Sequence, residues 1–153
     1  MLLKELVTCK HYKFADEAES WRDAIRMSCA PLEADGSVTA DYKEEIIRAV
    51  ERYGPYIIIM PNVAIPHAQK CTDSVKRTAV SFLKLKKPVC FMDGEQKEYY
   101  VQNFFTLACC DAEAHIKNLT ELVELLMKQE FVKEFERLTS EQDLKNLQKK
   151  WEG

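Results

Sequence analysis

The sequence predicts an α/β sandwich, with one mixed, mostly parallel sheet of about five strands and helices on both faces, in a single domain over residues 1–153. Three observations support this prediction. Apolar residues recur at helical spacing in the first and last thirds, whereas the middle third holds short β-branched runs. The length of 153 residues suits one domain, and a 46% share of hydrophobic residues can form a core. Helices at both ends of a strand-rich middle favour one sheet covered by helices.

One short strand and two helices are predicted for the first third of the chain. The strand spans residues 9–14, and Asp16, with Glu19 three residues further on, is a candidate N-cap for the first helix. Apolar residues then recur at helical spacing as far as Pro31, where we expect this helix to end because proline breaks helices.

The second predicted helix leads into the strand-rich middle of the chain. It begins after the candidate N-cap Thr39 and ends at Gly54-Pro55, because glycine is common just after a helix and proline cannot continue one. A turn at 86–88 and another at 93–94 divide the apolar runs that follow. The predicted strands are 56–59, 62–65, 78–85, 89–91 and 101–110, the last being the most apolar and therefore the candidate central strand.

The last third of the chain is predicted to be helical. Asp111 is a candidate N-cap for a helix that extends to about Met127. A short helix follows over 131–138. Ser140, with Asp143 three residues later, resembles a capping box and opens the last helix.

Charge and hydropathy exclude several classes of protein. The chain has 22 Lys and Arg against 25 Asp and Glu, so its net charge of −3 indicates neither nucleic acid nor a membrane surface as a partner. Lys4 and Glu5 interrupt the apolar N-terminus too early for a signal peptide. The longest aliphatic run, 57–60, is too short to insert into a membrane. We therefore expect a cytoplasmic protein.

Glycine and cysteine patterns exclude two further kinds of site. With 4 glycines, the chain can form neither a G-x-G-x-x-G motif nor a P-loop, so any phosphate must be held by side chains. No pair among the 6 cysteines has C-x-x-C spacing. We expect reduced thiols that are buried or incidental, and no metal site.

His67 is the strongest candidate among the 3 histidines. It directly follows Pro66, which fixes its own φ and holds Ile65 extended, so His67 is expected at the rim of the sheet on a stiff backbone. An exposed imidazole is mostly neutral at pH 7 and has a lone pair available for nucleophilic attack. On these grounds alone, a packing or loop histidine remains an open interpretation.

The other two histidines differ in their surroundings. His115 lies in the first turns of the helix that Asp111 caps, where the positive end of the helix stabilises anions and a histidine can donate to phosphate oxygens. A histidine at the edge of the core, donating to a carbonyl, is the alternative. His11 lies beside Lys10 near the N-terminus and is predicted to be an ordinary surface histidine.

Two segments resemble a known family. Residues 54–68 read GPYIIIMPNVAIPHA, and the pattern around Asp111 and His115 continues as H-I-x-x-L-x-x-L about 48 residues after His67. Both segments are similar to the enzyme IIA components of the bacterial phosphoenolpyruvate-dependent sugar phosphotransferase system, mannitol/fructose class. The Gly-Pro-Tyr start and residues 85–89 are most like the ascorbate-specific subgroup. The resemblance extends over essentially the whole chain.

The resemblance implies a phosphotransferase subunit without a cofactor or metal. His67 would receive a phosphoryl group from the phosphocarrier protein HPr and pass it to a cysteine of the cognate enzyme IIB, which serves a membrane enzyme IIC. His115 would stabilise the phosphoryl oxygens. Mannitol-type proteins also have an arginine at the end of the second helix that supports the phosphate. The matching position here is near Arg52 or, with a different gap, Glu51. Arg77 is a weaker candidate for the same role.

The sequence leaves open whether the protein is a transport subunit or a regulator. A regulatory module that signals through phosphorylated His67 to a kinase or transcription factor would share the same motifs, and an ordinary α/β domain without histidine chemistry is a third interpretation.

The docking surface for HPr and IIB is expected to be an apolar rim around His67 that includes Val63, Ile65 and the start of the His115 helix. The sequence does not identify the sugar.

Overall fold

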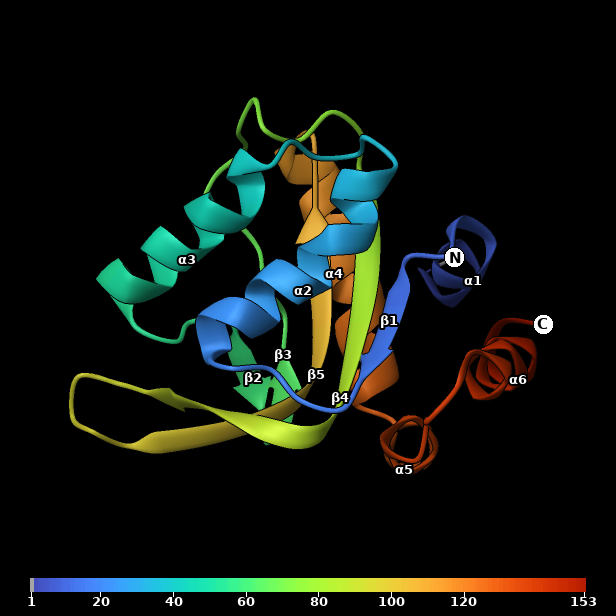
Figure 1. Cartoon of the computed structure of the whole chain (residues 1–153). Helices are drawn as coiled ribbons and strands as arrows, with labels where there is room; N and C mark the ends of the chain where they lie inside the picture. The colour runs from blue at the N-terminus through green and yellow to red at the C-terminus, as the bar shows by residue number, and fades with distance from the viewer. Residues whose placement is uncertain (1) are drawn as a thin grey trace.

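A computed structural model describes residues 2–153 and contains a five-stranded mixed sheet in the order β1-β4-β5-β3-β2 (Figure 1). The β1–β4 and β3–β5 pairs are parallel, whereas the β4–β5 and β2–β3 pairs are antiparallel. The predicted α/β class is confirmed, and the most apolar run forms the central strand. The strands are β1 Tyr12–Ala15, β2 Ile58–Met60, β3 Asn62–Ala64, β4 Ala79–Met92 and β5 Glu98–Ala108.

Helices cover both faces of the sheet, as predicted (Figure 1). Two of them, α2 and α3, pack on one face with a first apolar cluster, and the other four lie on the opposite face with a second cluster. The helices are α1 Leu2–Cys9, α2 Trp21–Ala34, α3 Asp41–Tyr53, α4 Ala112–Leu126, α5 Gln129–Glu136 and α6 Glu141–Glu152. Among residues 2–153, no helix is both long and apolar enough to cross a membrane.

The central strand β5 joins the two apolar clusters. Phe104 and Ala108 belong to the cluster on the α2–α3 face, whereas Phe105 and Leu107 belong to the opposite one. Because successive side chains of a strand point to opposite faces, a strand buried on both faces reads as a continuous apolar run. The end of β5 is therefore held by both layers, and the candidate functional residues lie beside it.

The N-terminal helix α1 and the limits of α2 differ from the prediction. Leu2, Leu3 and Leu6 are buried in the second cluster, so α1 is an amphipathic helix that the sequence analysis did not predict. The N-cap of α2 is Ser20, whose side chain accepts from the backbone of Asp23, rather than Asp16. The helix also continues through Pro31, because the packing of its buried face offsets the cost of a proline in the helix.

Two further elements correct the prediction. Thr39 does not cap α3, because the N-cap position is Ala40, without a side-chain hydrogen bond. The predicted turn at 86–88 lies inside β4, which runs without interruption past Pro88. The register of β4 against β5 shifts between Lys84 and Val89, and this bulge accommodates a proline that cannot donate to the ladder. The N-caps Asp111 and Ser140 are confirmed, with side chains accepting from backbone N–H groups at 2.8 and 3.2 Å.

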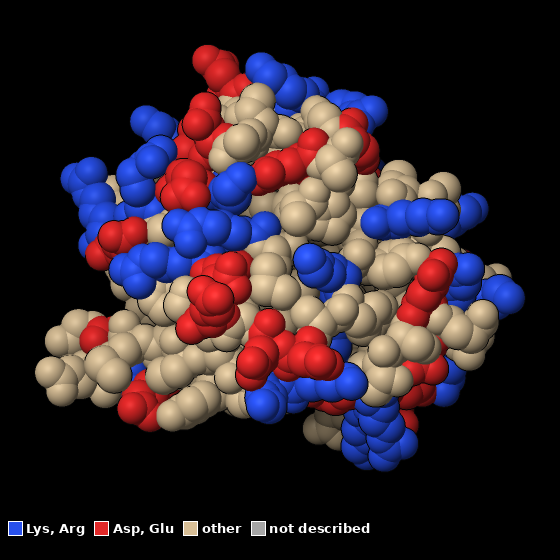
Figure 2. Space-filling view, viewed as in Figure 1, with Lys and Arg blue, Asp and Glu red and all other residues tan. Residues whose placement is uncertain are grey.

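The outer half of the β4–β5 hairpin extends beyond the other strands (Figure 1). In the space-filling view this projection is largely uncharged, whereas basic and acidic side chains are interspersed over α2 and α3 (Figure 2). This face of the molecule therefore has no extended field of one sign.

Gly54, at the end of α3, provides a test of the backbone geometry. Its φ of 83° and ψ of −176° lie in a region that glycine alone adopts readily. A Cβ there would meet no atom within 4 Å, so any cost of Gly54→Ala is conformational. We expect this variant to lower the free energy of unfolding by about 2 kcal/mol in urea titrations. Gly94→Ala is the matched control, because its Cβ also meets nothing and its φ is not positive; equal losses in both variants would contradict this account.

Candidate active site

His67 lies just beyond the end of β3, on a backbone that is held on both sides. The N–H of Ile65 donates to the carbonyl of Ile57 at 2.7 Å, and the N–H of Leu107 donates to the carbonyl of Pro66 at 2.9 Å. These bonds attach the residues before His67 to the chain after α3 and to β5. The predicted position at the rim of the sheet is confirmed, and the side chain is half-buried rather than fully exposed.

The His67 ring has one nitrogen engaged and one available. Its Nδ1 lies 2.6 Å from the carbonyl oxygen of Ile65. Since a carbonyl oxygen only accepts hydrogen bonds, Nδ1 carries the proton of the neutral ring and Nε2 carries the lone pair. Tyr56 packs edge-on against the imidazole at 5.2 Å between ring centroids, and its hydroxyl donates to the His67 carbonyl. Nε2 is therefore the ring nitrogen whose lone pair is available.

Burial of the imidazole lowers the pKa of His67 below its ordinary value of 6.5. The hydrogen bond to Ile65 acts in the opposite direction, and positive charge on His115 lowers the pKa of His67 further. Because the protonated form is disfavoured, the Nε2 lone pair persists at neutral pH.

The His115 side chain approaches the His67 ring from α4, on the face of the sheet opposite α2 and α3. It lies in the first turn of α4, whose N-cap Asp111 accepts from the Ala114 N–H. The rings of His67 and His115 have centroids 5.1 Å apart and planes inclined by 41°. The structure therefore brings the two predicted histidines together, next to the positive end of a helix.

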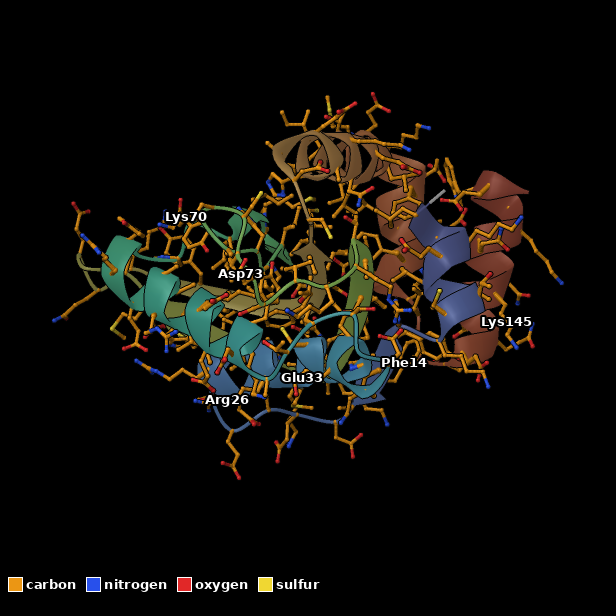
Figure 3. All side chains as sticks on the ribbon, turned by 90° about the horizontal axis from the view of Figure 1, so that it is seen from above. Phe14, Arg26, Glu33, Lys70, Asp73 and Lys145 are labelled. Atoms are coloured by element: carbon orange, nitrogen blue, oxygen red, sulfur yellow. The ribbon has the colours of Figure 1, made fainter. Side chains whose placement is uncertain are left out.

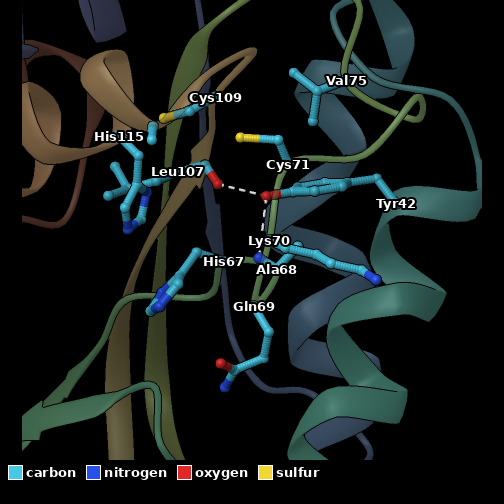
Figure 4. Close-up of a pocket in the computed structure, with 11 residues that line it drawn as sticks. Tyr42, His67, Ala68, Gln69, Lys70, Cys71, Val75, Leu107, Cys109 and His115 are labelled. Carbon is cyan, nitrogen blue, oxygen red and sulfur yellow. Dashed lines mark hydrogen bonds between the residues drawn. The ribbon is translucent and has the colours of Figure 1, made fainter.

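Both histidines line a cavity of about 370 Å³ (Figure 4). Its wall combines the end of β5, the start of α4, the start of α3 and the loop after His67. None of the described residues in the wall is an aspartate or glutamate. The lining residues are Tyr42, His67, Ala68, Gln69, Lys70, Cys71, Val75, Leu107, Cys109, Ala112 and His115. Among residues 2–153, no group of three or more histidines, cysteines or acidic residues is arranged to hold a metal ion.

Tyr42 fixes the backbone that follows His67. Its hydroxyl donates to the Leu107 carbonyl at 2.6 Å and accepts from the Ala68 N–H at 3.3 Å (Figure 4). The side chain is 2% exposed, and burial raises its pKa, so the hydroxyl stays protonated. The sequence does not single out Tyr42, because no local pattern signals a bond between residues 65 positions apart.

The predicted arginines are not in the cavity wall. Arg52 lies in the last turn of α3 and borders a different depression, with its guanidinium carbon 5.3 Å from the centroid of the Tyr53 ring. Arg77 donates to the carbonyl of Asp35 at 2.7 Å and lies 3.4 Å from the carboxylate of the same residue. The structure brings neither arginine to the two histidines.

The prediction that His11 is a surface histidine is wrong. Its side chain is buried, and its Nε2 lies 2.5 Å from Asp35 Oδ2. Burial raises the pKa of Asp35, but hydrogen bonds from Ser37 and His11 outweigh that effect and lower the pKa to about 2. The unpredicted helix α1 explains the difference, since the His11 N–H bonds to the carbonyl of Leu6 and holds the histidine against the domain.

The predicted apolar rim around His67 is only partly present. Val63 and Ile65 are both fully buried in the second apolar cluster, so they cannot touch a partner. Val63 lies in β3 and Ile65 just after it, and β3 is covered on both faces, which a three-residue strand does not reveal by alternation. At the start of α4, Ile116 is 64% exposed beside His115, so this part of the predicted rim faces solvent.

Comparisons with known proteins identify the family of the chain. Residues 5–151 match the family described as "Phosphoenolpyruvate-dependent sugar phosphotransferase system, EIIA 2". The chain belongs to this EIIA family. It is a phosphoryl carrier of a sugar phosphotransferase system.

Other EIIA proteins resemble the chain along nearly its whole length. The ascorbate-specific PTS system EIIA components of Shigella boydii and Escherichia coli K12 are each 30% identical over 147 residues, covering 95% of this chain and 94% of theirs. The crystal structure of a putative PTS IIA from Streptococcus mutans aligns with a TM-score of 0.84 at 25% identity, over 97% of this chain and 93% of that one. A mannitol-specific cryptic EIIA of E. coli aligns at 0.79 and 25% identity, over 96% and 97%.

The state of the His67 ring in this EIIA protein can be measured directly. Long-range ¹H–¹⁵N NMR should show the proton on Nδ1 and a pKa below 6.5. As the pH falls from 8, the Nε2 lone pair should persist to a lower pH than in a free histidine. His115→Gln should raise the pKa of His67, because it removes a neighbouring positive charge. A His67 pKa above 6.5, or a proton on Nε2, would refute the geometry described above.

Tyr42→Phe tests the hydroxyl that holds the loop. The change leaves the Leu107 carbonyl and the Ala68 N–H without their partner, so we expect a loss of about 1–3 kcal/mol in urea unfolding and faster hydrogen exchange at Ala68. Tyr100→Phe removes an exposed hydroxyl bonded to Glu98 and should change stability by less than about 0.5 kcal/mol. Unaltered exchange at Ala68 would show that the hydroxyl does not hold it.

Proposed function

We propose that His67 accepts a phosphoryl group from phosphorylated HPr and passes it to a cysteine of the cognate enzyme IIB, in the cytoplasm. The observation that carries the proposal is the pairing of the His67 and His115 rings, 5.1 Å apart, with His67 Nδ1 hydrogen-bonded to a backbone carbonyl. This pairing leaves a single nucleophilic nitrogen beside a second imidazole, an arrangement suited to holding a phosphoryl group.

Each transfer exchanges one bond to phosphorus for another. In the first transfer, the lone pair of His67 Nε2 forms a bond to phosphorus while the P–N bond of phosphorylated HPr breaks and its electron pair returns to the HPr histidine. His67 Nδ1 keeps its proton and donates it in a hydrogen bond to the Ile65 carbonyl, so the phosphorylated ring is cationic. In the second transfer, a thiolate of IIB attacks phosphorus, and the P–N electron pair returns to His67 as a neutral ring. A retained Nδ1 proton thus makes His67 a good leaving group.

His115 and the N-terminus of α4 stabilise the charge during both transfers. Phosphoryl transfer depends mainly on positioning and on stabilisation of charge spread over the phosphoryl oxygens. His115 can donate to one of those oxygens, and the free N–H groups of the first turn of α4 add a positive field. Arg52 remains a prediction in this scheme.

We propose ascorbate as the sugar of the system and a membrane enzyme IIC as the indirect partner. Support for ascorbate comes from the relatives at 30% identity, which are ascorbate-specific components. We further propose that residues 1–153 act as a single EIIA domain, with no cofactor or metal.

Labelling from phosphoenolpyruvate, enzyme I and HPr tests the acceptor. The unsubstituted protein should take up an alkali-stable, acid-labile phosphoryl group, and His67→Ala should lose it. His115→Ala should keep His67 as the labelled residue but take up the label at least about tenfold more slowly, because a donor to the oxyanion is lost. The matched control is substitution of the buried His11, which should leave the label on His67. Labelling of His67→Ala at the unsubstituted level would overturn the proposal.

Onward transfer separates a transport subunit from a regulator. Labelled protein mixed with the cognate IIB should transfer its phosphoryl group, and a IIB whose acceptor cysteine is replaced by serine should receive none. If His67 is labelled but no IIB cysteine accepts the group, the regulatory interpretation is favoured instead.

A further inference from the structure

The charge of the cavity wall is concentrated in one residue. Of the eleven residues that line the cavity of His67 and His115, Lys70 is the only lysine, arginine, aspartate or glutamate. Seen from above, its loop lies between α3 and α4 (Figure 3). The lining residues therefore include one permanent cation and no carboxylate.

A phosphoryl group on His67 would be stabilised by a cation beside its oxygens. The group brings about two negative charges into a half-buried site. His115 and the N-terminus of α4 contribute hydrogen-bond donors and a partial charge, but Arg52 and Arg77 lie outside the cavity wall. Besides the phosphorylated ring itself, the permanent cation among the lining residues is Lys70, in the loop after His67.

We infer that Lys70 is the cation of the site: its ammonium group binds the phosphoryl oxygens when His67 is phosphorylated. The inference rests on the proposed function and assigns to a loop lysine the phosphate-supporting role that the resemblance implied for an arginine near Arg52.

The loop geometry suits this role. Lys70 follows His67 by three residues, and the Tyr42 hydroxyl holds the intervening Ala68 N–H, so the start of the loop is fixed relative to the histidine. The Lys70 side chain is exposed, and none of the described carboxylates lies within ion-pairing distance of it. In Figure 4 its ammonium group points away from His67. A flexible four-carbon stem lets it rotate towards the cavity once a phosphoryl group attracts it.

Three variants test the inference in a phosphorylation equilibrium with HPr. Lys70→Met keeps the length but removes the charge, Lys70→Arg keeps the charge, and Lys76→Met removes an exposed lysine of the same loop that does not line the cavity. The equilibrium constant for phosphoryl transfer from HPr to His67 should fall about tenfold in Lys70→Met, as for the loss of one charge-assisted hydrogen bond. It should stay within about twofold in the other two variants. The constant should also depend on salt less strongly in Lys70→Met than in the unsubstituted protein.

The outcomes separate this inference from the proposed function. Equal constants and equal salt dependence in Lys70→Met and Lys76→Met would overturn the role of Lys70 while leaving His67 as the acceptor. A tenfold fall in Lys70→Arg as well would also overturn it, because charge would not be the property that matters. Failure of the unsubstituted protein to take up label on His67 would overturn the proposed function and this inference together. Matching thermal unfolding curves for all four proteins show that folding is not the cause.

Discussion

The backbone of Leu107 is the point on which the site depends. Its N–H holds the carbonyl of Pro66, and its carbonyl holds the Tyr42 hydroxyl, which in turn binds the N–H of Ala68. His67 is thus fixed on both sides to one residue of the central strand. Because the ring is also tied through Nδ1 to its own backbone at Ile65, the position of Nε2 follows from the sheet. No glycine-rich loop is needed to position this nitrogen.

Local patterns predicted those parts of the fold that local chemistry decides. Asp111 and Ser140 were found because a cap is a contact over three residues, and β5 because a strand buried on both faces is continuously apolar. Thr39 failed as a cap, and Pro31 failed to end a helix, because packing against distant elements outweighed local preference. The helix α1 was missed because eight residues carry too little periodicity to stand out.

The two histidines of the site were predictable from the sequence, but the hydrogen bonds and packing around them were not. His67 and His115 stand out by the proline before one and the helix cap before the other, and their resemblance to a known family joined them. Tyr42 and Lys70 did not stand out, because the hydrogen bonds of Tyr42 and the place of Lys70 in the cavity wall exist only after folding. His11 was misjudged for the same reason: charged neighbours in sequence did not prevent burial against Asp35.

The site also spans the sheet. Tyr42 belongs to the apolar cluster on the α2–α3 face, whereas Cys109 and the start of α4 belong to the cluster on the opposite face. Two cores that face away from each other therefore meet at one cavity, and neither can assemble it alone. Partial unfolding of either layer dismantles the acceptor site as completely as global unfolding does. The fraction of molecules with an assembled site is thus set by the cooperativity between the two layers. The chain works as a carrier only as an intact three-layer unit.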